Sequence, residues 1–600
     1  MPQWNTFREE ARKMRLEKTG KPVNRKYILL RLWEYIYKFK GYFFVGIFLT
    51  VASNLLSLAG PVLSGKAVGA AEAGAGLVDF KRVVFYCALM LAFYAASSLL
   101  SYLLSVVMIT LSRKIILKMR TDVFDKIMEL PAGYFDNCKA GDVISRISYD
   151  IDTVNASLSN DFIQLLTSII TVTGSFIAMV YLCMPLLCVF FVTIPAMVFF
   201  VRMRTKTLRP LFSARSRKLG EMNGYAEEII SGTKVIKAYG TEKVMIDKFE
   251  KVNAEAADAY YDAEYYASAV GPSVNFINNI SLALISGLGA GLYLFNMLSL
   301  GDLSAFIMYS RKFSGPINEA ANILSDLQSA MAAAERVFSM TDEIPEPADA
   351  PGAAELDDVK GDIELSDLHF GYDETEVLHG IDLKLKAGST AAVVGATGSG
   401  KTTLINLLMR FYDPWKGDIF LDGRNIKSVT RKSLRKSYAM VLQDTWLFYG
   451  TIYDNIKYGN EGATRREVEA AAKKVHIHDY IMSLPDGYDT VLSDDGVNIS
   501  KGQKQLIAIA RAMLSDARML ILDEATSNID MHTEALLAEA MEKLTRGRTS
   551  FIIAHRLSTV RNADIILVMD KGRITERGTH DELMARGGAY FELYSAGMAE

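Results

Sequence analysis

Long apolar runs fill much of the first half of the chain. They cover residues 42–61, 83–111, 162–181, 185–201, 274–295 and 303–331. Most reach the roughly 20 residues that a helix needs to cross about 30 Å of hydrocarbon, and helices buried in soluble proteins do not account for runs this long. The fourth run is short, and the sixth contains Arg311 and Lys312, so hydropathy supports these two least. The pattern predicts an all-α transmembrane domain of six helices within residues 1–340.

Basic residues indicate how these helices are oriented. Lysine and arginine are concentrated before the first run, between the second and third runs, and between the fourth and fifth. The positive-inside rule therefore places the N-terminus, these two connections and the C-terminal half in the cytoplasm, in a multi-pass protein of the cell membrane. Residues 27–40 mix aromatic and basic side chains. They predict an interfacial helix on the lipid bilayer, with an ordinary packed helix as the alternative.

The two basic connections are much longer than a chain reversal requires. Both have mainly helical patterns, so the spans are expected to continue into the cytoplasm as long paired helices. Their tips are predicted at residues 131–136 with 141–142, and at residues 224–228. These hairpins are either solvated extensions or arms that contact the C-terminal domain.

The second half of the chain has a different pattern. Residues 341–360 predict a linker, because proline, alanine and acidic residues cluster there. From residue 361 to residue 600, short β-like runs alternate with helices, which is typical of an α/β domain. The formal net charge of −3 argues against a nucleic acid as partner.

Residues 395–403 match the phosphate-loop pattern G-x-x-x-x-G-K-[ST]. An apolar run at 390–394 predicts a strand before the loop, and residues 404–409 predict a helix after it. Glycines let backbone N–H groups turn toward a phosphate, and the helix N-terminus favours the same anion. Lys401 would meet the β- and γ-phosphates of ATP, and Thr402 would ligate Mg²⁺. The predicted ATP-binding residues of this loop are Gly395, Thr397, Gly398, Ser399, Gly400, Lys401, Thr402 and Thr403.

Two further strand ends contain candidate catalytic side chains. Residues 518–522 predict a buried strand followed by Asp523, which can hold Mg²⁺. Glu524 comes next and can deprotonate the attacking water. Residues 551–554 predict another strand with His555 at its C-terminal end, where ligand groups collect in such sheets. A packed structural histidine is the alternative for His555.

Further motifs resemble those of a known family. The stretch at residues 498–505 looks like the L-S-G-G-Q signature of ATP-binding cassette (ABC) exporters. Gln443 matches the Q-loop, Tyr372 the aromatic residue that stacks on adenine, and Asp530 the end of the D-loop. His555 matches the switch histidine. The chain thus resembles, along nearly its whole length, one half-transporter of the type I ABC exporter fold, with the membrane domain first.

This resemblance implies how the ATP site is completed. Two chains form a transporter, and two ATP molecules lie head to tail between the two cassettes. Ser500, Gly502 and Gln503 would bind the γ-phosphate held by the partner's phosphate loop. Gln443 would take part in catalysis and in Mg²⁺ binding.

Two departures from the family pattern concern assembly. Position 501 is lysine where the consensus has glycine, and the D-loop is Ser-Asn-Ile-Asp rather than Ser-Ala-Leu-Asp. Together with Glu524, the D-loop resembles the catalytically complete subunit of heterodimeric, multidrug-type bacterial exporters. A heterodimer with a second half-transporter is therefore favoured, and a homodimer stays open because this chain lacks no catalytic residue.

The expected function is ATP-driven export of a small amphipathic or hydrophobic molecule. The alternatives are an importer built on the exporter fold, as for metal chelates, and a soluble cassette ATPase acting on DNA or ribosomes. The predicted spans and the absence of a basic domain oppose the soluble ATPase. Two polar faces either line a wet cavity or bond between helices. They consist of Asn275, Asn278 and Asn279, and of Asn318, Asn322 and Asp326.

Overall fold

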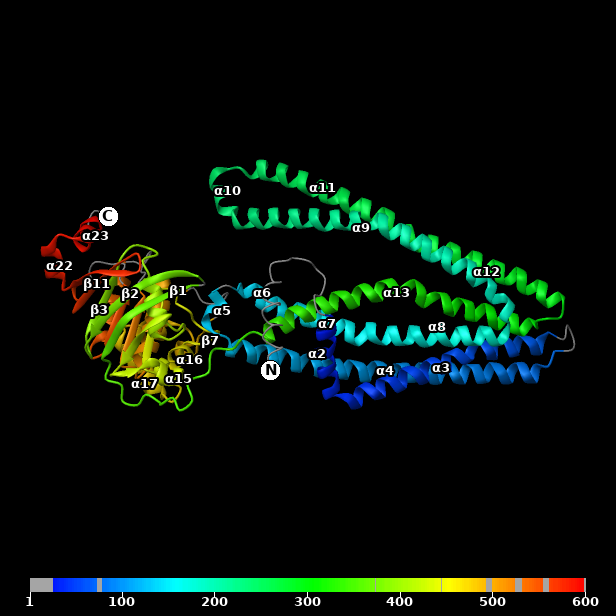
Figure 1. Cartoon of the computed structure of the whole chain (residues 1–600), viewed down its shortest axis with the longest axis horizontal. Coiled ribbons are helices and arrows are strands. Elements are labelled where there is room, and N and C mark those ends of the chain that lie inside the picture. Colours follow the sequence, from blue (N-terminus) through cyan, green and yellow to red (C-terminus); the bar gives the residue numbers. More distant parts are fainter. Residues whose placement is uncertain are drawn as a thin grey trace. The chain divides into compact units, whose positions relative to one another are not determined.

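The structure is a computed structural model that describes residues 25–72, 78–136, 138–372, 374–443, 445–492, 499–523, 531–553 and 560–597 (Figure 1). The chain forms two compact units. Unit 1 consists of Met1–Met128 and Lys139–Glu343. Unit 2 consists of Glu129–Cys138 and Ile344–Glu600.

Unit 1 is built from long helices. They are α2 (Arg25–Lys38), α3 (Lys40–Ala71), α4 (Phe80–Glu129), α6 (Ala140–Ser145), α7 (Ile151–Ala156), α8 (Phe162–Leu182), α9 (Cys188–Ser231), α10 (Thr233–Tyr239), α11 (Glu242–Ser268), α12 (Val270–Leu294) and α13 (Leu300–Thr341). Short π-helical segments, η2 (Arg146–Asp150) and η3 (Ser157–Asp161), join α6, α7 and α8, and the 3-10 turn η4 (Met184–Leu187) precedes α9.

Five helical segments of the described chain are long and apolar enough to cross a membrane. They are Lys40–Ala71, Phe80–Glu129, Ala140–Leu182, Met184–Ser231 and Glu242–Leu294. Five of the six predicted spans are thus confirmed by length and composition. The sixth forms a helix, α13, but is not in this set, because Arg311, Lys312 and Glu319 interrupt its apolar stretch.

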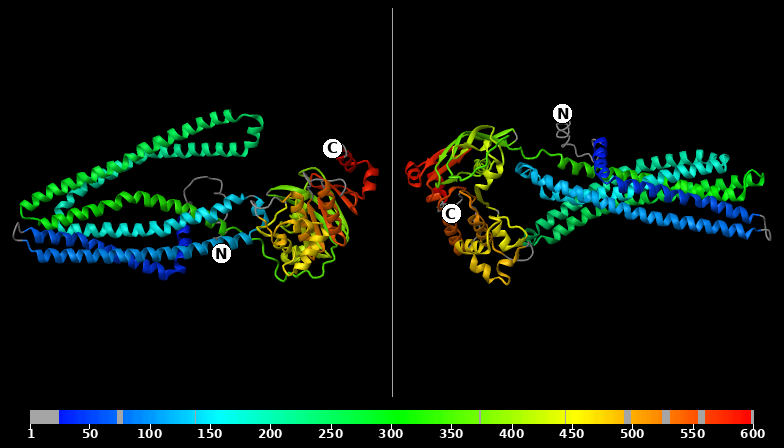
Figure 2. Two further views of the ribbon diagram at one scale, coloured as in Figure 1. Left: turned by 180° about the vertical axis from the view of Figure 1, so that it is seen from behind. Right: turned by 90° about the horizontal axis from the view of Figure 1, so that it is seen from below.

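The helices on either side of the second basic connection extend well past a bilayer. Helix α9 has 44 residues, which corresponds to about 66 Å at a rise of about 1.5 Å per residue. Helices α9 and α11 run side by side, and α10 joins them (Figures 1 and 2). The predicted tip at residues 224–228 is wrong: these residues lie inside α9, since a glycine such as Gly224 is tolerated within a helix. The reversal occurs at α10, where Gly240 takes a left-handed φ of 61° and ends the helix.

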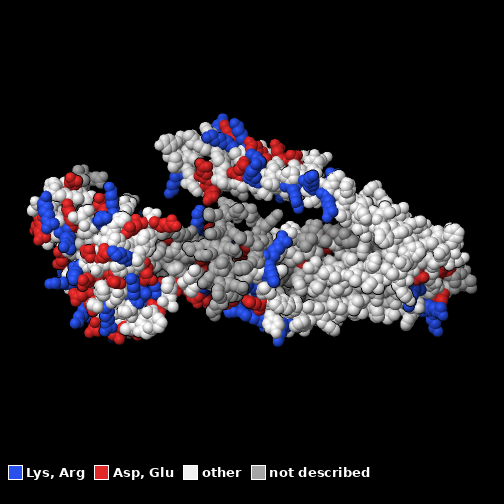
Figure 3. All heavy atoms as spheres, in the orientation of Figure 1, with Lys and Arg blue, Asp and Glu red and all other residues white. Residues whose placement is uncertain are grey.

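The surface of the α9–α11 hairpin has more charged side chains than the surface of the spans (Figure 3). In Figure 3, acidic and basic side chains gather on the hairpin, whereas the apolar part of unit 1 shows few. Ion pairs link its two helices: Arg215 to Glu264 at 2.7 Å and Lys218 to Glu255 at 2.6 Å. Such ion pairs are typical of a hairpin that is exposed to water and not to lipid.

Helix α2 is fastened to the ends of two long helices. Tyr35 donates a hydrogen bond to Asp122 of α4 at 2.9 Å, and Arg31 pairs with Asp342, directly after α13, at 3.1 Å. Its opposite side exposes an apolar stripe at helical spacing, formed by Leu29, Leu30, Trp33 and Tyr37. Such a stripe is suited to the predicted interfacial position.

Unit 2 contains two main sheets. The six-stranded sheet has the order β12-β11-β3-β10-β9-β6, and the four-stranded sheet has the order β2-β1-β4-β5. The strands of the larger sheet are β3 (Thr390–Val394), β6 (Tyr438–Val441), β9 (Met519–Asp523), β10 (Thr549–Ile553), β11 (Ile565–Asp570) and β12 (Arg573–Gly578). Those of the smaller are β1 (Ile363–Tyr372), β2 (Thr375–Leu385), β4 (Lys416–Leu421) and β5 (Arg424–Asn425). A short ribbon pairs β7 (Gly450–Thr451) with β8 (Val491–Leu492).

Helices surround these sheets. They are α5 (Ala132–Asp136), α14 (Lys401–Leu408), α15 (Arg431–Lys436), α16 (Ile452–Lys457), α17 (Arg465–Lys474), α18 (His478–Ser483), α19 (Lys501–Leu514), α20 (Met531–Thr545), α22 (His580–Arg586) and α23 (Ala589–Gly597). The four central strands β3, β9, β10 and β11 are almost wholly apolar and buried, as expected for a parallel sheet covered on both faces. The predicted α/β character of the C-terminal half is confirmed.

Candidate nucleotide site

The site is formed where parallel strands end. The registers pair Val393 of β3 with Ile553 of β10, and Ile553 with Asp523 of β9. Strand β9 in turn pairs Leu522 with Val441 of β6. The carboxyl ends of these four strands therefore share one edge of the sheet, the edge at which such folds bind ligands.

The phosphate loop leaves β3 at this edge and leads into α14. Three of its glycines have left-handed φ angles: 149° at Gly395, 81° at Gly398 and 100° at Gly400. A Cβ at Gly395 would lie 2.1 Å from the carbonyl oxygen of Met569. No heavy atom lies within 4 Å of a Cβ built at Gly398, on the open side of the loop. The glycines are thus needed for the conformation itself, as the motif predicts.

Two polar side chains of the loop suit a phosphate group. The Nζ of Lys401 donates to the carbonyl oxygens of Gly395 and Ala396 at 2.8 and 2.9 Å, and its side chain is 7% exposed. Burial lowers the pKa of Lys401, which a bound anion would oppose. The Oγ of Ser399 is buried and has no hydrogen-bond partner among the described residues. A phosphate oxygen would satisfy that hydroxyl, so the residues present fit a nucleotide.

The predicted metal ligands lie at the same edge. Thr402 is exposed in the first turn of α14, Asp523 ends β9, and Gln443 follows β6 by two residues and is exposed. Their hydroxyl, carboxylate and amide oxygens are donors that Mg²⁺ accepts. Glu524, Asp530 and His555 lie outside the described residues, and their assigned roles stay predictions.

Tyr372 ends β1 and is tied to the loop's helix. Its hydroxyl accepts a hydrogen bond from Asn406 of α14 at 3.3 Å. Its ring meets Tyr412 edge-on, with centroids 5.3 Å apart and an interplanar angle of 89°. This contact sets the orientation of the ring that is predicted to stack on adenine.

The signature residues begin another helix, α19. The Oγ of Ser500 accepts from the backbone N–H of Gln503 at 3.2 Å, and the Gln503 side chain accepts from the Ser500 N–H at 2.9 Å. This capping box fixes the helix start, and Gly502 is buried in its first turn. Lys501 is exposed. Binding of a partner's γ-phosphate by this helix end stays a prediction.

The sequence left open whether the tip at residues 131–136 is solvated or belongs with the C-terminal domain. Residues Glu129–Cys138, between α4 and α6, belong to unit 2 rather than to the membrane helices. The hydroxyl of Tyr412 donates to Asp136 at 2.5 Å, and the backbone N–H of Glu346 donates to the carbonyl of Glu129 at 2.8 Å. The tip of the first predicted arm is therefore part of the nucleotide-binding unit, where it is bonded to the tyrosine that packs on Tyr372.

The predicted linker is also held on unit 2. Arg431, 6% exposed, pairs with Asp349 at 3.2 Å and with Asp413 at 2.9 Å. Arg435 forms a forked pair with Glu346. The acidic residues that make this segment look like a linker are thus partners of arginines far along the chain. The limits predicted at 340/341 and 360/361 stay predictions.

Comparisons with known proteins give the family. Residues 43–317 match the family model "ABC transporter transmembrane region", and residues 378–527 match the family model "ABC transporter". An uncharacterized ABC transporter ATP-binding protein, YfiC of Bacillus subtilis, is 41% identical over 581 residues, covering 97% of this chain and 96% of its own. A "Fatty acid ABC transporter ATP-binding/permease protein" of Mycobacterium tuberculosis is 42% identical over 520 residues, covering 86% and 82%.

The chain belongs to the ABC transporter family. A solved structure of a bacterial Atm1-family ABC exporter with ATP bound is similar, with a TM-score of 0.76 and 30% identity, covering 94% of this chain and 99% of that one. The protein is therefore a half-transporter of the exporter fold that acts in a dimer, binds and hydrolyses ATP, and spans the membrane several times. The predicted family, fold class and ATPase activity are confirmed.

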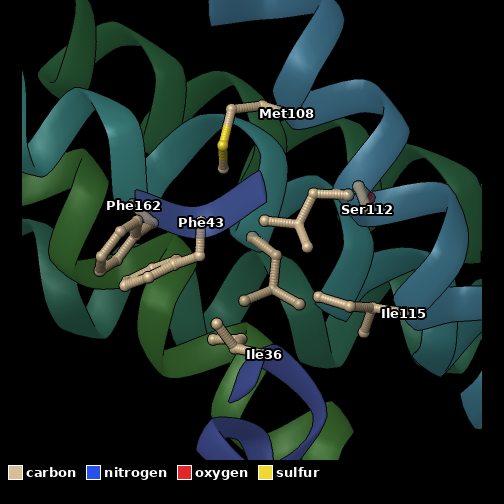
Figure 4. A pocket seen from close by; sticks show the side chains of 8 residues that line it. Ile36, Phe43, Met108, Ser112, Ile115 and Phe162 are labelled. Atoms are coloured by element: carbon tan, nitrogen blue, oxygen red, sulfur yellow. The ribbon is translucent and has the colours of Figure 1, made fainter. Parts of the chain in front are cut away.

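The structure locates one of the two predicted polar faces. Asn275 and Asn279 on α12 are exposed and Asn278 is half-buried, whereas the side chains of Asn318 and Asn322 are outside the described set. The cavity in Figure 4 is lined by Ile36, Phe43, Met108, Leu111, Ser112, Ile115, Leu158 and Phe162. Its volume of about 10 Å³ leaves room for roughly one water molecule, so it is not a substrate chamber.

Proposed function

We propose that this chain is one half of an ATP-driven exporter of small amphipathic or hydrophobic molecules. ATP bound with Mg²⁺ at Thr402, Gln443 and Asp523 would be sandwiched between two cassettes, with Ser500 of each chain facing the partner's phosphate loop. Closure on ATP would favour the outward-open membrane domain, and hydrolysis would return it to the inward-open one. The cassettes and the N-terminus would lie in the cytoplasm of the cell.

The observation that supports this proposal is that the residues directly after a span's extension belong to the cassette unit. Helix α4 leads directly into Glu129–Cys138, which is part of the cassette unit. There Asp136 bonds Tyr412, and the Tyr412 ring packs against Tyr372, whose hydroxyl is bonded to the helix of the phosphate loop. A change in the position of Tyr372 on binding adenine would thus be transmitted through two side chains, Tyr412 and Asp136, to the segment that directly follows α4.

The catalytic roles follow from position. Glu524 comes directly after the metal-binding Asp523 and would accept the proton of the attacking water. His555 comes two residues after β10 in the sequence and would sense the γ-phosphate. Gln443 lies in the connection between β6 and α16. Binding of the metal by Gln443 would therefore be transmitted to the helical part of the cassette.

Assembly is proposed to be a heterodimer of the multidrug type. This chain has a complete set of catalytic residues and the Ser-Asn-Ile-Asp D-loop, which resembles the fully active member of such pairs. The other half would hold the weaker ATP site. A homodimer would instead show two equal sites, which nucleotide titration of the purified transporter distinguishes.

The test is the direction of transport in inside-out membrane vesicles. With the cassettes facing the medium, ATP should drive a fluorescent amphiphile into the vesicles, and a non-hydrolysable analogue should not sustain uptake. Glu524→Gln serves as the matched control, because it keeps size and ATP binding but removes the base. ATP-dependent loss of the amphiphile from preloaded inside-out vesicles would instead indicate an importer.

A further inference from the structure

Helix α13 contains two adjacent cations, Arg311 and Lys312, of which Arg311 is exposed and Lys312 is half-buried. Lys312 lies about 18 Å along the helix from its start at Leu300, and its partner Ser57 lies near the middle of the candidate span Lys40–Ala71. Its Nζ donates to the backbone carbonyl of Ser57 on α3 at 2.7 Å and to the Ser57 hydroxyl at 2.8 Å. No carboxylate of the described residues forms an ion pair with it. A charge at this depth is costly and usually serves a purpose.

A proline in α3 explains why the carbonyl of Ser57 is free to accept a hydrogen bond from Lys312. Pro61 lies inside α3 and has no N–H, so the carbonyl of Ser57, four residues before it, loses its helical partner. The Lys312 ammonium replaces that donor. Pro316 likewise leaves the backbone carbonyl of Lys312 without its helical N–H donor in α13. Both helices therefore lack one backbone hydrogen bond near Lys312.

A missing donor does not require a charged one. Neighbouring carbonyls of α3 bond to neutral hydroxyls: Tyr309 donates to Leu58 at 2.5 Å, and Ser97 donates to Ser53 at 2.8 Å. The ammonium group has three N–H donors, and the two described bonds go to one residue. The side chain is only partly buried, which leaves access to its charge.

Polar groups continue from Ser57 along the same side of α3. Asn54, one turn earlier, donates through Nδ2 to the backbone carbonyl of Thr50 at 2.7 Å and to the hydroxyl of Thr167 at 3.3 Å. Its Oδ1 accepts from the hydroxyl of Thr171 at 3.4 Å, and both threonines are on α8. One turn further along α8, the Oγ of Ser175 is buried without a described partner. On α13, Glu319 follows Lys312 by two helical turns, and its carboxylate is held by Gln164 at 2.7 Å.

We propose that Lys312 and Ser57, with the Asn54–Thr167–Thr171 group beside them, bind the anionic head of the transported molecule. The substrate class is then an amphiphile with one carboxylate or phosphate head and an apolar tail. The apolar tail would lie against the apolar side chains of the surrounding spans. This inference rests on the proposed function, because it assigns the substrate of the same membrane domain.

The test measures binding of probes that share one tail and differ in the head. The full transporter in phosphatidylcholine nanodiscs is titrated at pH 8 with oleate, oleyl phosphate and oleyl alcohol. Loss of a charge-assisted hydrogen bond corresponds to about a 10- to 100-fold change in affinity. We expect wild type to bind an anionic probe at least tenfold more tightly than the alcohol, and the tighter of the two anions gives the head group.

Three variants separate charge from helix capping. Lys312→Gln retains an N–H donor for Ser57 but has no charge, and it should bind the anions no better than the alcohol. Lys312→Arg should keep the preference, and so should Arg311→Met, which removes the exposed neighbouring charge. The thermal unfolding midpoint of each purified variant reports that the protein is folded.

Two results overturn the inference: wild type binding the alcohol as tightly as both anions, or Lys312→Gln keeping the preference for an anion. The proposed function fails separately. Oleate bound through Lys312 but moved out of preloaded inside-out vesicles would keep the binding site and refute export. Export of oleate that is unaffected by Lys312→Gln would keep the function and refute the site.

Discussion

The close approach of Gly133 to Tyr412 gives a sharp test of coupling. A Cβ at Gly133 would lie 2.7 Å from both Cε1 and Oη of Tyr412. Gly133→Ala should therefore push this ring away from Tyr372 and strain its bond to Asp136. Overpacking of this kind costs about 1–3 kcal/mol, which shifts a docking equilibrium by about 5- to 150-fold.

The expected result is a transporter that hydrolyses ATP but moves less substrate. The phosphate loop is untouched, so ATP hydrolysis without substrate should stay near wild type. The number of substrate molecules moved per ATP, measured in proteoliposomes, should fall, by at most the factor given above. Thermal unfolding of the purified protein reports whether the cassette itself is disturbed.

Gly141→Ala is the matched control. Gly141 lies in the same connection, within α6, and no heavy atom lies within 4 Å of a Cβ built there. Alanine is also the better helix former at both places, so helix propensity acts in the same direction in both variants. If Gly133→Ala transports as well per ATP as Gly141→Ala, the contact does not couple the two units.

Three other substitutions test the nucleotide site and the arginine–carboxylate network that holds residues 346–349 on the cassette. Lys401→Ala should abolish ATP hydrolysis while the protein still inserts and folds; near-normal turnover would refute the assigned loop. Glu524→Gln should lower the hydrolysis rate by about 10²–10⁴-fold with ATP still bound, and lost nucleotide occupancy would contradict its role as base. Arg431→Met should destabilise the cassette by about 1–3 kcal/mol, since the carboxylates of Asp349 and Asp413 lose one of their two arginine partners and keep Arg410. An unchanged denaturant midpoint would argue against that network.

Local motifs explain what the sequence could predict of the site. The phosphate loop needs only a strand, its glycines and a helix, all within some 20 residues, so its position at the end of β3 was predictable. The shared edge with Asp523 and Gln443 follows from parallel pairing of apolar strands. Tyr372 was assigned by resemblance, whereas its bond to Asn406 depends on how the two sheets pack.

Contacts between distant parts of the chain were not predictable. Glu346 and Asp349 look like linker residues because acid, proline and alanine are typical of linkers, yet their arginine partners lie more than 60 residues away. The attachment of Glu129–Cys138 to the cassette depends on Tyr412, which no local pattern marks. The second arm's tip was misplaced because Gly224 stays helical, and the true turn uses Gly240 in a left-handed conformation.

The most direct test of the central claim is the coupling of the two activities in one preparation. Uptake of oleate into inside-out vesicles and release of phosphate should be measured together for wild type and Lys401→Ala. The account predicts ATP-dependent inward accumulation in proportion to phosphate released, and neither process in the variant. Oleate accumulation that continues in Lys401→Ala, or hydrolysis by wild type with no transport of any of the three oleyl probes, would contradict it.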